Sequence, residues 1–297
     1  MANNKQENNS SSPDIITLPN YISETIESID VNCINPALSI NHFFAKVPTL
    51  DHIPYLFAET MITTHKGKIQ INKPISSSTL CNGQFRSLMQ DLAARNERLA
   101  ATFAAHATIN YRPATKLLLG ADGPSPYSNI NLLKLHQLYG LPYLSASMLK
   151  GSLRSYWILT KYDGQEEAAL KDPLFRQLFG VGASDEQGLT GTLIFLDTFP
   201  TDFSFALEVQ TPHYPDYYNG PKSNDNQPPP TDTQNPVPLY FICLQEAEFN
   251  IPIACRDAVL WDKQHDTICA LFQELLTQYG LGAKTALGYG QGTAEEK

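Results

Sequence analysis

The C-terminal part of the chain joins an amphipathic helix to a loop that is dense in glycine. Apolar residues recur at helical spacing and predict a helix over about Asp262–Tyr279 with one buried face. Gly280 follows at the position where a helix commonly ends on a glycine C-cap. From Gly280 to Gly290 the chain reads Gly-Leu-Gly-Ala-Lys-Thr-Ala-Leu-Gly-Tyr-Gly. The helix must therefore bury its apolar face against the rest of the domain and end at residue 280.

This glycine loop, residues 280–290, has two interpretations. Glycines let a backbone approach a ligand closely, and backbone N–H groups beside a lysine suit phosphate oxygens. The same glycines could instead form only a helix cap and a tight hairpin. A Walker A loop is excluded, because Ala283 stands directly before Lys284 and the loop follows a helix. We expect the phosphate-contacting residues to be Gly282, Lys284, Thr285 and Gly288.

Helical and extended patterns alternate along the rest of the chain. Helices are predicted over about 82–106 and from Ser145 or Ser147 to about Lys161, and strands over Lys116–Leu119, Gly191–Asp197 and Pro238–Leu244. From Lys116 onward the order is strand, helix, strand, strand, helix and a final short extended segment. This order predicts an α+β fold of the ferredoxin-like (RRM-like) β-α-β-β-α-β type.

The domain organisation follows from composition. Residues 1–15 are rich in Asn and Ser and predict a disordered tail. Residues 16–297 are expected to form a single domain with an N-terminal helical elaboration. A long excursion over about 211–236, rich in Pro, Asn, Asp and Tyr, predicts a loop insertion.

Charge and cysteine usage limit the function classes. The net charge of −9 argues against a freestanding nucleic-acid binder, so any RNA contact must be local and is more plausible within an assembly. The five cysteines are scattered and form no CxxC pair, which indicates neither disulfides nor a metal site. No cofactor motif is present. Without an apolar run of membrane-spanning length, the protein is expected to be cytoplasmic, with no membrane partner.

The helix after Ser145 carries a basic stripe beside its apolar one. Lys150, Arg154 and Lys161 lie at i, i+4 and i+11, and Gly151 inside the helix costs about 1 kcal/mol relative to alanine. The glycine indicates that something packs or binds close to the backbone there. A solvated helix face is the alternative explanation for Lys150 and Arg154.

An aromatic segment opens the loop insertion. His213, with Tyr214, Tyr217 and Tyr218, could form a metal-independent RNase-like acid/base set. Structural packing is the competing interpretation, and the tyrosines could equally stack on bases. Asp197, an isolated acid at a strand end, is interpreted as structural.

Taken together, these motifs resemble the RAMP superfamily of CRISPR-associated RNA-binding proteins, and within it the family of sixth Cmr subunits of type III-B effector complexes. One departure is that Ser145-Ala-Ser147 replaces the family's Pro-Gly-Ser-Ser lead-in to the basic helix. The motifs that carry the resemblance are Gly140-Leu-Pro-Tyr-Leu144, Leu149-Lys-Gly-Ser-Leu-Arg154, Leu178-Phe-Gly180, Phe195-Leu-Asp197, Thr211-Pro-His-Tyr-Pro215 with Tyr217-Tyr218, and Gly280 to Gly290.

The resemblance implies a Cas7-like subunit in antiviral defence that binds crRNA near its 3′ end and helps to recognise target RNA without cleaving it. The implied protein partners are other Cmr subunits, namely the backbone and capping RAMP subunits and the small subunit. Two alternatives stay open. One is a metal-independent RNA endonuclease that uses His213, and the other is a protein-interaction module without direct RNA contact.

Overall fold

The protein was analysed as a computed structural model. It describes residues 83–124, 130–182, 188–211, 213–214, 216–217, 229–231 and 239–297, together with short strands of the N-terminal region. Those strands are β1 (Ile15–Thr17), β2 (Phe43–Val47), β3 (Asp51–Pro54), β4 (Ile62–His65), β5 (Lys68–Ile71) and β6 (Ile75–Ser76). The N-terminal elaboration thus contains strands as well as one long helix, α5 (Gly83–Ala100). The predicted tail before Ile15 lies outside the described residues.

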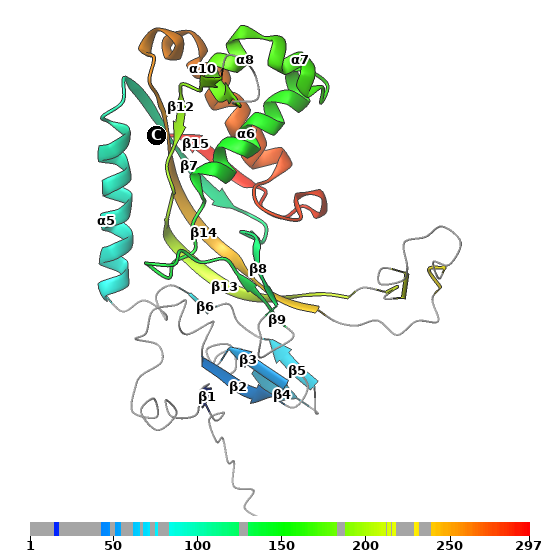
Figure 1. The fold of residues 1–297 in the computed structure, drawn as a ribbon. Coiled ribbons are helices and arrows are strands. Elements are labelled where there is room, and N and C mark those ends of the chain that lie inside the picture. Colours follow the sequence, from blue (N-terminus) through cyan, green and yellow to red (C-terminus); the bar gives the residue numbers. More distant parts are fainter. Residues whose placement is uncertain are drawn as a thin grey trace, which may run out of the picture.

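A central antiparallel sheet organises the domain (Figure 1). Its main strands, in spatial order, are β15 (Gly292–Glu296), β7 (Ala105–Pro113), β14 (Leu239–Cys255) and β13 (Pro200–Gln210). The short strand β12 (Leu193–Phe195) pairs with the far end of β14, so β12 and β13 form one interrupted strand beside it. The short strands β6, β8 (Ala121–Pro124) and β9 (Ile130–Leu133) extend the sheet.

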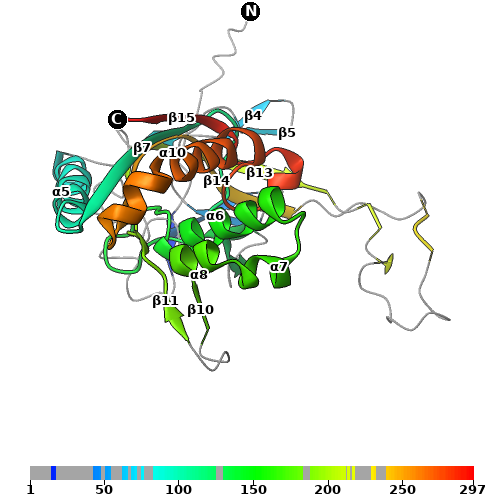
Figure 2. The same cartoon turned by 90° about the horizontal axis from the view of Figure 1, so that it is seen from above.

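Two helices lie side by side against this sheet (Figure 2). They are α6 (Ala146–Lys161) and α10 (Ala258–Glu274), and a π-helical turn, η3 (Leu275–Tyr279), continues the second. In chain order the elements are β7, α6, β12 with β13, β14, α10 and β15. The predicted ferredoxin-like α+β fold is therefore confirmed, because the strand order 4-1-3-2 with all main neighbours antiparallel is what a split β-α-β arrangement produces.

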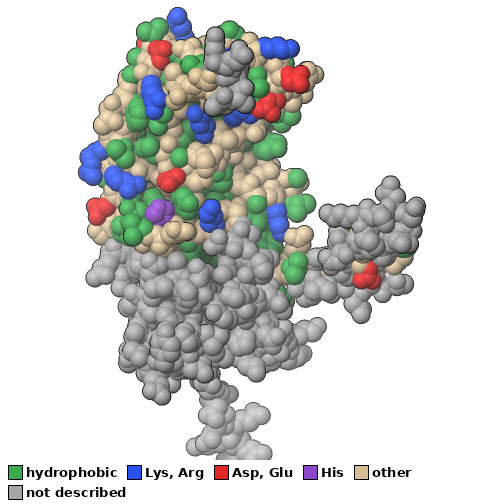
Figure 3. Space-filling model, viewed as in Figure 1, with side chains coloured by type: hydrophobic (Ala, Val, Ile, Leu, Met, Phe, Trp, Pro, Cys, Tyr) green, Lys and Arg blue, Asp and Glu red, His purple; other side chains and the backbone are tan. Residues whose placement is uncertain are grey.

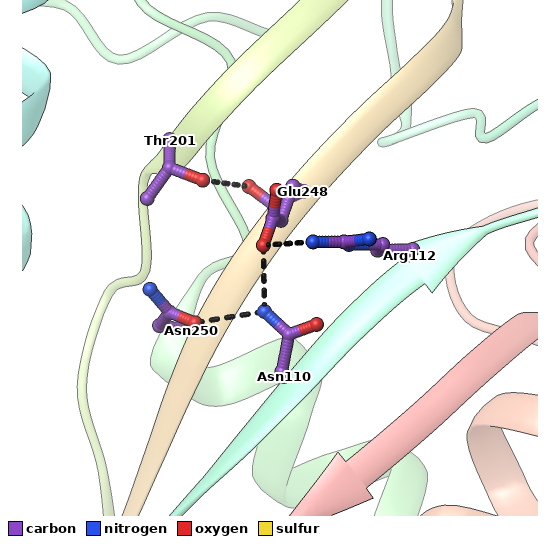
Figure 4. Close-up of polar contacts among 5 residues, drawn as sticks. All are labelled: Asn110, Arg112, Thr201, Glu248 and Asn250. Atoms are coloured by element: carbon purple, nitrogen blue, oxygen red, sulfur yellow. Dashed lines mark hydrogen bonds and ion pairs between the residues drawn. The ribbon is translucent and has the colours of Figure 1, made fainter. Parts of the chain in front are cut away.

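Side chains of β7 alternate between the buried and the exposed face of the sheet, and those on the exposed face contact β14. Ile109 and Tyr111 are fully buried, while the alternate residues Asn110 and Arg112 point to the other face. There both bond to Glu248 of β14 at 2.9 Å, as Figure 4 shows. Burial alone would raise the pKa of Glu248, but the hydrogen bonds from Asn110 and Arg112 outweigh it and lower the pKa.

Side-chain caps define where the helices begin. The Ser145 hydroxyl accepts the N–H of Met148 at 3.2 Å, which confirms the predicted start of α6. Asp257 caps α10 in the same way. Asp172 caps α8 (Pro173–Phe179), which follows the short helix α7 (Glu166–Lys171). The hairpin β10 (Gly180–Val181) and β11 (Leu189–Thr190) comes next.

The structure corrects several predicted boundaries. The helix expected over about 82–106 ends at Ala100, and the following strand, β7, was missed because its first residues were assigned to that helix. The strand expected over Lys116–Leu119 is wrong, since this segment forms only isolated bridges to Leu244 and Ala283.

Two further strands have bounds that differ from those their sequence patterns indicate. The strand expected over Gly191–Asp197 shrinks to β12, and β13 follows it unpredicted. Five consecutive residues of β13, 203–207, are buried, so it lacks the polar alternation that identifies a half-exposed strand. The strand expected over Pro238–Leu244 continues to Cys255.

The segment of the predicted loop insertion lies between β13 and β14, and most of it falls outside the described residues. In the described residues, no helix is both long and apolar enough to cross a membrane.

Candidate nucleic-acid interface

The first half of α6 carries the basic residues that the sequence singled out. Leu149, Leu153 and Trp157 anchor the opposite face of the helix in the core. The carboxylate of Asp197 accepts the N–H of Ala146 at 2.7 Å and so supports the start of the helix. This contact agrees with the structural role expected for Asp197.

Lys150 lies beside a second cation that the sequence analysis missed. Burial and the nearby charge of Arg256, which follows β14, lower the pKa of Lys150. Within the described residues, no carboxylate lies in salt-bridge range of either side chain. No sequence signal marks Arg256, because only the fold brings the end of β14 next to α6. Among the described residues, Lys150 and Arg256 therefore form a local positive charge that favours an anion.

Arg154 is less available to bind an anion than its position on the basic stripe implies. Its guanidinium donates to Glu166 at 2.6 Å and lies 5.2 Å from the ring centre of Phe175. Arg154 therefore connects α6 to α7 and α8. Its positive charge stays at a fixed position on the surface.

Two adjoining hollows follow α6. The first, about 730 Å³, is lined by Lys150 and Arg154 of α6, by Glu166, and by backbone of the β10–β11 hairpin. The second, about 300 Å³, shares Arg154 and Glu166 with it and extends to Tyr279. Figure 3 shows that basic side chains on this face are interspersed with acidic ones, so the positive charge is local. A surface track thus leads from Lys150 to the residue before the glycine loop.

The glycine loop packs against its own chain. The N–H of Ala283 donates to the carbonyl of Leu118 at 2.8 Å, and that of Gly290 donates to Lys116 at 2.9 Å. A Cβ at Gly282 would come within 2.4 Å of the carbonyl oxygen of Leu118. The close approach that needs glycine at this position is therefore to the backbone of residues 116–118, and not to a ligand.

Gly288 differs from the other loop glycines. It has φ +85°, and a Cβ there would find only one atom within 4 Å. It ends the single 3₁₀ turn, η4 (Thr285–Leu287), whose residue Leu287 is 72% exposed. The tip of the loop, with Thr285 and Gly288, is consequently the part that faces outward.

Lys284 projects across the end of the sheet. It adopts a left-handed conformation with φ 61°, and its ammonium lies 3.8 Å from the ring centre of Phe241 and bonds to Gln210. Burial lowers its pKa, while the nearby Glu208 carboxylate acts in the opposite direction. These contacts hold the Lys284 side chain in place, and its main interaction in the structure is a cation–π contact with Phe241.

The two predicted basic elements do not share one cavity. Lys150 and Arg154 line the first hollow, whereas Lys284 contacts the ends of β13 and β14. Gly151 lies on α6 with its Cα exposed and with space for a Cβ. Nothing within the described residues therefore requires a glycine at that position.

The aromatic segment at the start of the loop insertion is only partly described. His213 is exposed, and its ring lies 6.4 Å from that of Tyr214. Tyr217 is 37% exposed, and Tyr218 lies outside the described residues. The acid/base interpretation of His213 stays a prediction.

Comparison with known proteins identifies the family. A model of the RAMP superfamily matches residues 110–292. The chain is 25% identical to the CRISPR system Cmr subunit Cmr6 of Pyrococcus furiosus, over 62% of this chain and 66% of that protein, slightly less than two thirds of its length.

Solved structures are similar at lower levels. A type III-B Cmr-beta complex bound to cognate target RNA contains a chain with 20% identity and a TM-score of 0.48, covering 74% of this chain and 70% of that chain. The crystal structure of Cmr6 from Pyrococcus furiosus gives 22% identity and a TM-score of 0.34, covering 65% and 98%. The family match spans more than half of the chain, from β7 through both sheet-packing helices to β15, and the protein therefore belongs to the RAMP superfamily.

Proposed function

We propose that this protein is a non-catalytic crRNA-binding and assembly subunit of a type III-B Cmr effector complex. The observation that carries the proposal is the positive charge at the first hollow of a RAMP domain, where Lys150 and Arg154 line the hollow and the charge of Arg256 acts on Lys150. Similarity to the Cmr6 subunit of Pyrococcus furiosus supports the type of complex. The partners are crRNA near its 3′ end, target RNA, and the backbone, capping and small Cmr subunits.

The electrostatics favour an anionic ligand at Lys150 and Arg256. Burial first, and the nearby charge of Arg256 second, lower the pKa of Lys150. A phosphate between the two cations would relieve their repulsion and form charge-assisted hydrogen bonds with both. The overall charge of −9 excludes a broad positive field, so a few such contacts must position the RNA.

The rest of the track suits a single strand of RNA. Arg154 is held in place by Glu166, and Tyr279, 49% exposed, offers a ring face at the end of the second hollow. Aromatic rings stack on bases without regard to sequence, as a subunit that accepts any guide requires. The glycine loop follows directly, and its outward tip contacts the strand through backbone at Thr285 and Gly288.

Reconstitution of the complex with two charge-neutralised variants tests this function. Lys150→Gln and Arg256→Gln are compared with Lys161→Gln, an exposed lysine at the end of the same helix. Each of the first two should weaken RNA retention uniformly across guide sequences and reduce the salt dependence by about one phosphate contact. Lys161→Gln should leave both unchanged.

Crosslinking and cleavage assays separate the alternatives. Ultraviolet crosslinking of crRNA in the assembled complex should yield adducts on α6 or the glycine loop, and their absence would favour a protein-interaction module. The isolated chain should not cut repeat RNA. Specific cutting that disappears in His213→Ala would overturn the non-catalytic assignment.

A further inference from the structure

We propose that His265, Cys269 and Glu296 form a zinc site that joins α10 to β15. Their candidate ligand atoms, one ring nitrogen, the thiol sulfur and a carboxylate oxygen, all lie within 4.8 Å of one another. His265 Nε2 and Glu296 Oε1 are 2.8 Å apart. Ligands of a tetrahedral zinc ion sit roughly 3.3–3.8 Å from each other, given bonds of 2.0–2.3 Å, so adjustments within side-chain reach would complete the site.

Secondary structure places these residues for this geometry. His265 and Cys269 stand at i and i+4 on α10, so both project from one face of the helix. Glu296 comes from β15, the edge strand that α10 covers. Two ligands from one helix and a third from a separate element make a site that exists only in the folded domain, which is how metal binding becomes coupled to folding.

The chemistry of the three side chains selects zinc. Thiolate with imidazole and one carboxylate is a mixed soft and hard set that suits this borderline ion better than Mg²⁺ or Ca²⁺, which prefer oxygen ligands alone. Cys269 is 3% exposed, whereas His265 and Glu296 remain accessible from solvent. An ion can therefore enter from the surface and keep a water molecule as its fourth ligand.

Neighbouring groups hold His265 in the required orientation. Asp266 Oδ1 lies 3.1 Å from Nδ1, which leaves Nε2 directed toward Glu296. A carboxylate behind a ligating histidine is the usual outer partner in zinc sites. The ring of Trp261 packs edge-on at 5.1 Å between ring centres. The sequence alone indicated no metal because the cysteines form no CxxC pair, whereas this site uses one cysteine only.

The competing explanation is a charged imidazolium held between Asp266 and Glu296 without a metal. The two explanations differ in what Cys269 does. In the zinc site the thiol loses its proton and becomes a ligand, whereas beside an imidazolium it stays a buried thiol. The glycine loop connects α10 with its continuation η3 to β15. A zinc ion would link α10, before the loop, to β15, after it.

Metal titration of the full-length protein tests the site. After removal of metals with a chelator, Zn²⁺ is added in competition with a chromophoric chelator, and Co²⁺ serves as a spectroscopic probe. Glu296→Gln is compared with Glu295→Gln, which makes the same charge change one residue away on an exposed position of β15. Glu296→Gln should lower the affinity for one equivalent of zinc at least about tenfold. Glu295→Gln should bind zinc with the affinity of the parent protein.

The cobalt spectrum and Cys269→Ser complete the test. The parent protein and Glu295→Gln should show a near-ultraviolet thiolate-to-cobalt charge-transfer band, and Cys269→Ser should lose it. Because Cys269 is buried, Cys269→Ser could misfold, and circular dichroism checks its secondary structure. If that variant is misfolded, the comparison of zinc affinity between Glu296→Gln and Glu295→Gln tests the site by itself. Equal zinc affinity of those two variants, or a cobalt complex without the thiolate band in the parent protein, would overturn the site in favour of the imidazolium.

Discussion

Replacing Gly151 with alanine should change stability and RNA binding in opposite directions. The residue lies inside α6, where its backbone has no positive φ, and an added Cβ would meet no atom within 4 Å. Alanine therefore gains the full helix-propensity difference without strain, about 0.5–1 kcal/mol. For a chain of this size that corresponds to a rise in Tm of about 1–4 °C.

The RNA-binding effect has a separate cause. Gly151 is flanked by Lys150 and lies one turn from Arg154, so in the proposed binding mode a phosphate held by Lys150 would pass close to the bare helix backbone. A methyl group at this position would push the strand outward and weaken one charge-assisted contact, which is worth about 1.5–3 kcal/mol. Retention of crRNA should then fall by about tenfold or more, since 1.4 kcal/mol is a factor of ten.

Thermal unfolding and RNA retention in the reconstituted complex measure the two effects on one protein. Ser152→Ala is the matched control, because it also raises helix propensity but adds no Cβ. It should gain a little stability and keep its RNA affinity. A Gly151→Ala protein that is more stable and binds RNA unchanged would refute the idea that a ligand passes close to this backbone.

Other substitutions test the glycine loop and one helix cap. Gly282→Ala should cost about 2–5 kcal/mol of unfolding free energy, because its Cβ would meet the Leu118 carbonyl at 2.4 Å from a left-handed backbone; a stability within error of the parent protein would contradict the packed loop. Tyr111→Phe removes a buried hydroxyl that donates to a loop carbonyl at 2.6 Å and should cost about 1–3 kcal/mol in chemical denaturation, whereas a neutral result would mean that water replaces the bond. The hydrogen bond from Tyr162 lowers the pKa of Asp172, so this carboxylate stabilises the fold above the unfolded-state pKa and the stabilisation is lost as pH falls through the lower folded-state value. Asn caps a helix as well as Asp does, but its hydrogen bond with Tyr162 is no longer charge-assisted, so Asp172→Asn should be less stable by about 1 kcal/mol at pH 7 and approach the parent protein in acid; a pH-independent difference would exclude this explanation.

The helices that pack on the sheet were readable from the sequence because their signals are local. Ser145 lies directly before the apolar stripe of α6, and Gly280 directly after that of α10. Cap and stripe fall within one continuous segment, so neither depends on how the rest of the chain folds. The strands were harder, since β7 adjoins a helix and β13 is buried without alternation.

In the candidate site too, local sequence signals revealed some residues and only the tertiary fold revealed others. Lys150 and Arg154 were found because helical spacing places them on one face, but Arg256 follows a strand more than one hundred residues away and has no periodic signal. The glycine loop was expected to approach a ligand closely, whereas the close approach that requires glycine at Gly282 is to residues 116–118 of the chain itself, so the ligand contact stays a prediction.

By itself, the sequence determined the two sheet-packing helices and the ends marked by Ser145 and Gly280, because spacing and capping act between residues a few positions apart. It did not give the start of α10, which lies at Ala258 and not at the expected Asp262. Only the tertiary structure decided which charges become neighbours. It placed Arg256 beside Lys150, pinned Lys284 over Phe241, and brought Glu296 to His265 and Cys269. The physical reason is that electrostatic and ligand contacts depend on distances through space, which the pairing of β14 with its neighbours and of β15 with α10 establishes.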